Sequence, residues 1–129
     1  MMPTITSFYA GLLALLYLAL CARVIFYRRS HLISLGDKGD KALLKRMRVQ
    51  SNCAEYAPIG IVLLLLLEAG AAAPWLLNLL GLMLLLGRLA HAIGMSQTPQ
   101  IMILRQIGMV LTLLMIGLAA LFAVAFAIF

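Results

Sequence analysis

The stretch that decides the fold is residues 57–87, which read APIGIVLLLLLEAGAAAPWLLNLLGLMLLLG. Its only charged residue is Glu68, and the segment from Gly70 to Pro74 interrupts two long aliphatic runs. Glycine favours turns, and proline suits the first turn of a following helix. A transmembrane helix needs about 20 mostly apolar residues. The stretch therefore predicts a hairpin of two membrane-spanning helices.

The same hydropathy pattern extends outward from this hairpin to both ends of the chain. We expect helices over residues 5–27, 41–68, 74–95 and 100–129. The 129 residues are 65% hydrophobic and 11% charged, with a mean hydropathy of +1.11. This composition lies far from that of soluble domains. The sequence predicts a single domain, an all-α membrane protein with a four-transmembrane-helix bundle and no room for a soluble domain.

Basic residues are concentrated on one side of this bundle. The chain carries ten Lys and Arg against four Asp and Glu, a formal charge of +6. Cytoplasmic loops of membrane proteins are enriched in Lys and Arg, so we expect a cytoplasmic loop at residues 30–40 and both termini on the opposite side. This placement argues against a nucleic-acid partner. Eight of the ten fall in one stretch: Arg23, Arg28, Arg29, Lys38, Lys41, Lys45, Arg46 and Arg48.

The two cysteines, Cys21 and Cys53, show no metal-ligand spacing and are interpreted as packing residues, so no metal site is expected. The segment from Ala10 to Ala22 has the length of a signal-peptide core. It lacks a basic preceding region, and Leu20 is too bulky for the position before a cleaved cysteine. We therefore expect an uncleaved helix.

Ionisable residues inside membrane helices are costly and usually have partners or a function. In the second helix, Lys41, Arg48, Asn52 and Glu55 are spaced by seven, four and three residues. At 100° per residue they occupy an arc of about 60°. They predict one polar stripe on that helix.

The third and fourth helices add further polar groups near the same end. Arg88 and His91 are three residues apart, and Arg105 opens the fourth helix with Thr112 two turns later. Arg88 and Glu55 are expected at equal depth, about 22 Å from the hairpin turn at 1.5 Å per residue. Together these groups suit a multiply anionic ligand that accepts hydrogen bonds.

Each of these residues also has a simpler interpretation. Glu55 and Arg88 could form a structural ion pair, and Arg48 could extend to lipid headgroups. His91 could be a packing residue, and Arg105 an interfacial anchor. Taken together, these alternatives require several ionisable side chains, each of them costly to place in a membrane helix, to lie near one another without any function. We therefore favour a ligand site.

Two motifs carry a resemblance to a known family. They are R-x-x-x-N-x-x-E-Y-x-P over residues 48–58 and G-R-x-x-H over residues 87–91. The chain resembles the MAPEG family, the membrane-associated proteins in eicosanoid and glutathione metabolism, and its bacterial branch in particular. The resemblance covers essentially the whole chain, including helix number and orientation.

The resemblance implies a homotrimer in the bacterial inner membrane that binds glutathione as co-substrate between subunits. A lipophilic small molecule would arrive from the bilayer, among membrane lipids. Arg105 would lie near the glutathione sulfur and act in catalysis. The positions that the resemblance assigns to glutathione binding are Arg48, Asn52, Glu55, Tyr56, Arg88 and His91.

The implied function is a membrane-bound glutathione transferase, or a glutathione-dependent peroxidase, that acts on hydrophobic electrophiles. Ser51 and Met95 depart from the eicosanoid enzymes, in which an arginine and a tyrosine stand near these positions, and this argues against prostaglandin or leukotriene chemistry. The alternative is a non-catalytic lipid-binding or scaffold membrane protein of the same fold. A small multidrug transporter ranks last, because the first helix has no carboxylate.

Overall fold

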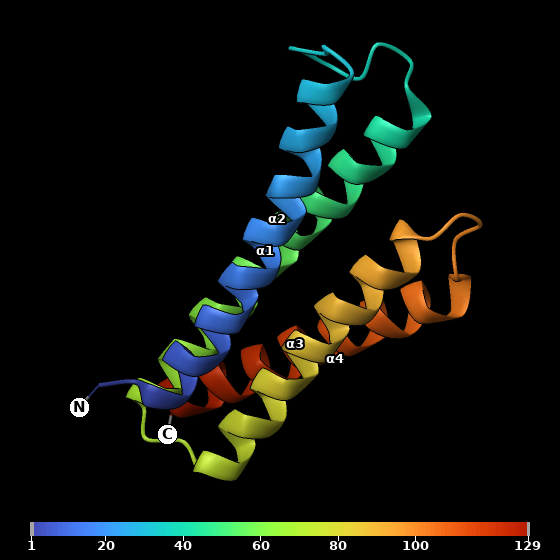
Figure 1. The fold of residues 1–129 in the computed structure, drawn as a ribbon. Helices are drawn as coiled ribbons and strands as arrows, with labels where there is room; N and C mark the ends of the chain where they lie inside the picture. Colours follow the sequence, from blue (N-terminus) through green and yellow to red (C-terminus); the bar gives the residue numbers. More distant parts are fainter. Residues whose placement is uncertain (1, 129) are drawn as a thin grey trace.

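Four long helices make up the protein, and a computed structural model describes residues 2–128 (Figure 1). All four are long and apolar enough to cross a membrane. The first helix extends three residues beyond the expected end, and the fourth begins two residues after the expected start. The last expected position, 129, lies outside the described residues. The helices are α1 (Thr4–Ser30), α2 (Lys41–Ala69), α3 (Pro74–Ser96) and α4 (Met102–Ile128).

The helices form two hairpins, α1 with α2 and α3 with α4, that cross at an angle (Figure 1). They are close together at the end that carries the α2–α3 turn, the start of α1 and the end of α4. They diverge at the opposite end, which carries the α1–α2 and α3–α4 loops. The sequence places most basic residues at this diverging end.

Aliphatic side chains from all four helices form the core. Leu13, Leu64, Leu80, Leu84 and Met115 are almost fully buried in it. Many other large apolar side chains are exposed along the helices, as expected where the surrounding solvent is lipid tails rather than water. The outward apolar surface is therefore available to lipid or to other subunits.

The α3 and α4 helices pack closely through glycines. A Cβ atom added at Gly94 would lie 2.7 Å from the backbone nitrogen of Arg105. At Gly87 it would lie 2.7 Å from the Thr112 hydroxyl oxygen, and at Gly108 it would collide with the backbone of His91. Small residues allow helix backbones in membranes to approach each other in this way. The contacts fix the α3 segment around His91 against the start of α4.

Two carboxylates complete helix N-termini. Asp40 caps α2 and accepts hydrogen bonds from the backbone N–H groups of Ala42 and Leu43 at 2.9 and 3.0 Å. Glu68, at the end of α2, accepts from the backbone N–H groups of Ile5 and Thr6 at 2.9 and 2.7 Å. The first four N–H groups of a helix have no partner within it. Glu68 therefore supplies from α2 the cap that α1 lacks in its own sequence.

Candidate functional site

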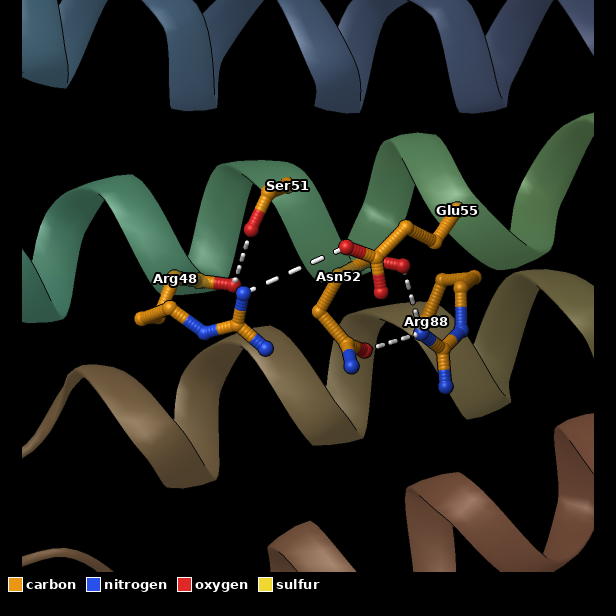
Figure 2. A network of polar contacts seen from close by, with 5 residues as sticks. All are labelled: Arg48, Ser51, Asn52, Glu55 and Arg88. Carbon is orange, nitrogen blue, oxygen red and sulfur yellow. Dashed lines mark hydrogen bonds and ion pairs between the residues drawn. The ribbon is translucent and has the colours of Figure 1, made fainter.

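The polar stripe of α2 contains an ion pair at its outer edge. The Arg48 Nη1 and Glu55 Oε1 atoms are 4.0 Å apart, and both side chains are 55% exposed (Figure 2). Ser51, between them, donates a hydrogen bond to the backbone carbonyl of Arg48 at 3.3 Å. An exposed pair of this kind contributes little to stability. Its groups are accessible to a ligand or to a neighbouring subunit.

Arg88 lies deeper and connects three helices. Its side chain is only 1% exposed. The Arg88 Nη1 atom donates to the Asn52 amide oxygen of α2 at 2.6 Å, and Nε donates to the Thr112 hydroxyl of α4 at 2.9 Å. The guanidinium also lies 5.2 Å from the ring centroid of Tyr56, within range of a cation–π interaction. Arg88 thereby orients Asn52 (Figure 2).

The interpretation of Glu55 and Arg88, expected at equal depth, as a structural ion pair is wrong. In residues 2–128 the Lys or Arg partner of Glu55 is Arg48, and Arg88 bonds to Asn52 instead. Equal distance from the hairpin turn fixed the depth of the two residues but not their direction around the helix. Asn52 and Glu55 differ by three residues, or about 60° of helix rotation. That rotation turns the amide toward α3 and leaves the carboxylate at the outer surface.

His91 of α3 and Arg105 of α4 both lie where these two helices pack closely, Arg105 with its backbone against Gly94. His91 is buried, and its backbone lies directly against Gly108. A buried position against a neighbouring helix is what we expect if His91 is a packing residue. Arg105 is half-buried in the first turn of α4, where Nη1 donates to the Gln100 amide oxygen at 2.9 Å.

The charges of this set do not balance. Arg48, Arg88 and Arg105 contribute three cations, and Glu55 contributes one carboxylate. The hydrogen-bond acceptors of Arg88 in the described chain are neutral groups on Asn52, Thr112 and Met109. A buried cation without a carboxylate partner is costly, and a nearby anionic ligand offsets that cost. The set is therefore suited to an anionic ligand.

Sequence reasoning missed one part of this network. The sequence did not predict that the Thr112 hydroxyl accepts a hydrogen bond from Arg88 Nε. The same hydroxyl donates to the Gly108 carbonyl at 2.9 Å. The Gly108 and Thr112 pair, two small residues four apart, was the available signal. Such pairs are enriched where membrane helices pack closely.

Comparison with known proteins decides the family. The sequence pattern of the MAPEG family matches residues 6–126. The chain belongs to the MAPEG family. It is 37% identical over 90 residues to Inner membrane protein YecN of Escherichia coli strain K12, covering 70% of this chain and 69% of that protein. The protein of the same name in Escherichia coli O6:H1 matches to the same extent. No solved structure matches.

The match to the MAPEG family covers the part of the chain that carries the polar residues of the site. The family pattern spans α1 through nearly all of α4, so it includes the α2 stripe, Arg88, His91 and Arg105. The four-helix, membrane-type fold agrees with the sequence expectation. The site residues themselves remain a prediction that binding and activity measurements can test.

Proposed function

We propose that this MAPEG member is an integral inner-membrane protein that binds glutathione and conjugates it to hydrophobic electrophiles, or reduces hydroperoxides with it. The observation that carries the proposal is the excess of arginines over carboxylates around Asn52. The family is described by its role in eicosanoid and glutathione metabolism, and relatives are named as inner membrane proteins. Glutathione has two carboxylates, which would supply the negative charge that the site lacks.

Glutathione also presents an ammonium group and a thiol, and the outer residues suit both kinds of charge. Arg48 provides a guanidinium for a carboxylate, and Glu55 provides an acceptor for the ammonium group. The Asn52 amide oxygen is occupied by Arg88, so its NH₂ group is directed to donate to the ligand. Arg88 is nearly fully buried and acts through Asn52 as a positioning residue.

Arg105 is the residue assigned to activation of the sulfur. The thiolate, not the thiol, is the nucleophile, and a nearby cation lowers the pKa of a thiol. Arginine suits this task because its guanidinium stays charged at all relevant pH values. The thiolate then attacks the electrophilic carbon of a lipophilic substrate that enters from the bilayer, and the leaving group departs with the bond electrons.

A homotrimer is the assembly proposed for this activity. Arg48 and Glu55 face outward from the single chain, and exposed apolar side chains line the helices around them. A neighbouring subunit would enclose the ligand and cover part of this surface. Mass measurement of the protein in lipid nanodiscs tests the stoichiometry.

The experiment that tests the function uses the purified full chain in nanodiscs. We expect millimolar glutathione to raise the melting temperature, because a ligand that binds the folded state stabilises it. We also expect glutathione-dependent conjugation of a generic aromatic electrophile, with a lipid hydroperoxide as the second substrate. The matched control is S-methylglutathione, which keeps the anionic groups but has no thiol. If glutathione neither stabilises the protein nor supports turnover, the non-catalytic lipid-binding or scaffold alternative is favoured.

A further inference from the structure

The two hairpins diverge at one end of the bundle (Figure 1). At this end a basic cleft lies between them, on residues that the proposed glutathione site does not use. Its cavity has a volume of about 300 Å³. The lining combines cationic side chains from α1 and α2 with hydroxyl groups from the end of α3 and the following loop. We call this the basic cleft, lined by Arg23, Lys41, Ala42, Lys45, Arg46, Ser96 and Thr98.

Cations and hydroxyl groups join the two walls of this cleft. The Arg23 Nη1 atom donates to the Ser96 hydroxyl at 2.7 Å. Lys45 Nζ donates to the Gln97 carbonyl at 3.0 Å and to the Thr98 hydroxyl at 2.7 Å. All of these acceptors are neutral. Lys41 and Arg46 add two further cations to Arg23 and Lys45. The hydrogen bonds described here leave all four positive charges without a negative partner.

The carboxylates of the chain are committed elsewhere. The chain has four Asp and Glu residues, and none lines the basic cleft. Asp40 and Glu68 cap helices, Glu55 pairs with Arg48, and Asp37 accepts from the Gly39 backbone N–H. No carboxylate lines the cleft, so an anionic ligand would supply its counter-charge.

A second cavity, mainly apolar, lies beside the cleft between α1 and α3. It has a volume of about 330 Å³ and shares Arg23 and Ser96 with the basic cleft. Leu16 and Arg23 are separated by seven residues of helix, a rise of about 10 Å at 1.5 Å per residue. The cavity thus extends from the level of the cations toward the membrane core. Its apolar lining consists of Leu16, Leu20, Leu89, Ala92 and Ile93.

We propose that the basic cleft and the apolar cavity beside it bind one anionic phospholipid, with the phosphate among Arg23, Lys41, Lys45 and Arg46 and an acyl chain along Leu16 and Leu89. Basic pockets between membrane helices suit lipid headgroups, which carry a phosphate above an apolar chain. A soluble phosphate would leave the apolar cavity without an occupant. This site does not depend on the proposed glutathione chemistry.

The test measures lipid binding to the purified full chain in neutral detergent. Dioleoylphosphatidylglycerol is titrated, with lipid adducts counted by native mass spectrometry and melting temperature followed in parallel. Dioleoylphosphatidylcholine has the same phosphate and chains without net charge, and glycerol 1-phosphate has the charge without chains. We expect only phosphatidylglycerol to bind at low concentration and to raise the melting temperature.

The variants are Arg23→Gln, Lys41→Gln and the charge-matched Lys38→Gln, which changes an exposed loop residue outside the cleft. Arg23→Gln and Lys41→Gln should each weaken phosphatidylglycerol binding about fivefold or more, as one cation near an anionic headgroup implies. Lys38→Gln should not. Lys41 makes none of the interhelical bonds described above. If Arg23→Gln does not fold, phosphatidylglycerol binding by Lys41→Gln therefore tests the proposal by itself. Equal weakening by Lys38→Gln, or equal stabilisation by glycerol 1-phosphate, would overturn the proposal.

Discussion

At the scale of single residues, Arg88 shows how a buried charge is held without a carboxylate. Its Nε and Nη1 groups bond to a hydroxyl and an amide, and the tyrosine ring of Tyr56 lies against the guanidinium. Hydrogen bonds to charged groups are worth more than those between neutral ones, and leaving a buried charge unsatisfied is costly. We therefore expect substitutions of Arg88 or of its acceptors to lower the stability of the folded protein.

Asn52→Leu tests this network. It removes the amide that bonds to Arg88 at 2.6 Å and leaves part of the guanidinium without an acceptor. We expect a loss of about 1–3 kcal/mol in the free energy of unfolding, the usual cost of an unsatisfied buried group. Reversible unfolding in mixed micelles measures it. Ser51→Ala, one position earlier, removes only a local bond to the Arg48 carbonyl and should change stability little. Equal effects of the two substitutions would contradict the assigned role of Asn52.

Arg105→Ala tests activation of the sulfur, given that glutathione binds. A free thiol has a pKa near 8.5, and a guanidinium beside it should lower that value by about one to three units. Bound glutathione should therefore show thiolate ultraviolet absorbance at neutral pH. In Arg105→Ala this absorbance should move to higher pH and conjugation should fall at least about tenfold, one pKa unit being a factor of ten in thiolate. Arg29→Ala, on the exposed end of α1, is the matched control. Full activity with an unchanged titration would assign activation to another group.

The Asp40 cap gives the protein a defined acid sensitivity. The Leu43 backbone N–H, followed by the Tyr27 hydroxyl, holds the pKa of the Asp40 carboxyl below its usual value. Folding is therefore linked to the ionised form: the stabilisation is complete above the unfolded-state pKa of about 3.9 and is lost as the pH falls through the lower folded-state value. We expect the melting temperature to fall below about pH 4. Asp40→Asn keeps a capping oxygen and should show a shallower fall. Identical pH profiles would show that Asp40 does not contribute.

At the scale of helices, hydropathy was sufficient to predict the number of helices, but not which of them pair most closely or how each is rotated about its axis. Each span is predicted by an apolar run of sufficient length, and the hairpin turn by Gly70 and Pro74. Which residue of the α2 stripe meets Arg88 depends on rotation of α2 against α3, and side-chain packing between helices sets that rotation. The Glu68 cap of α1 joins residues more than sixty positions apart, so no local pattern contained it.

Glycine contacts between α3 and α4 give a prediction at this scale. Gly108→Ala would place a methyl group against the backbone of His91 and Gly87, which cannot move aside as a side chain can. Overpacking of this kind costs about 1–3 kcal/mol, which exceeds the gain of about 1 kcal/mol from replacing a helical glycine. We expect a lower melting temperature and loss of the geometry around Arg105. Gly117→Ala, on the same helix with no neighbouring atom within 4 Å, should be neutral or stabilising. If both variants behave alike, the close approach of α3 and α4 is not required.

At the scale of the whole molecule, charge separates the two ends of the bundle. The diverging end carries both the basic cleft and the α1–α2 loop, whereas the α2–α3 turn, residues 70–73, contains no Lys or Arg. Retention of Lys and Arg in the cytoplasm orients membrane proteins. An anionic lipid bound in the cleft would hold the same end at the cytoplasmic leaflet, because anionic headgroups are concentrated there. The glutathione proposal also needs this orientation, since Arg48 and Arg105 lie near the diverging end.

Cysteine labelling in intact and opened cells tests the orientation. In a background with Cys21→Ala and Cys53→Ala, Ser34→Cys reports on the α1–α2 loop and Ala73→Cys on the α2–α3 turn, both at exposed positions. A membrane-impermeant thiol reagent should label Ala73→Cys in cells whose outer membrane alone is permeabilised. It should label Ser34→Cys only after the inner membrane is opened, because the loop lies among the cations retained inside. A reporter fused after Phe129 should read as non-cytoplasmic. The reverse labelling pattern would place the arginines of the site on the wrong side for cytoplasmic glutathione, and both the topology and the proposed function would then fail together.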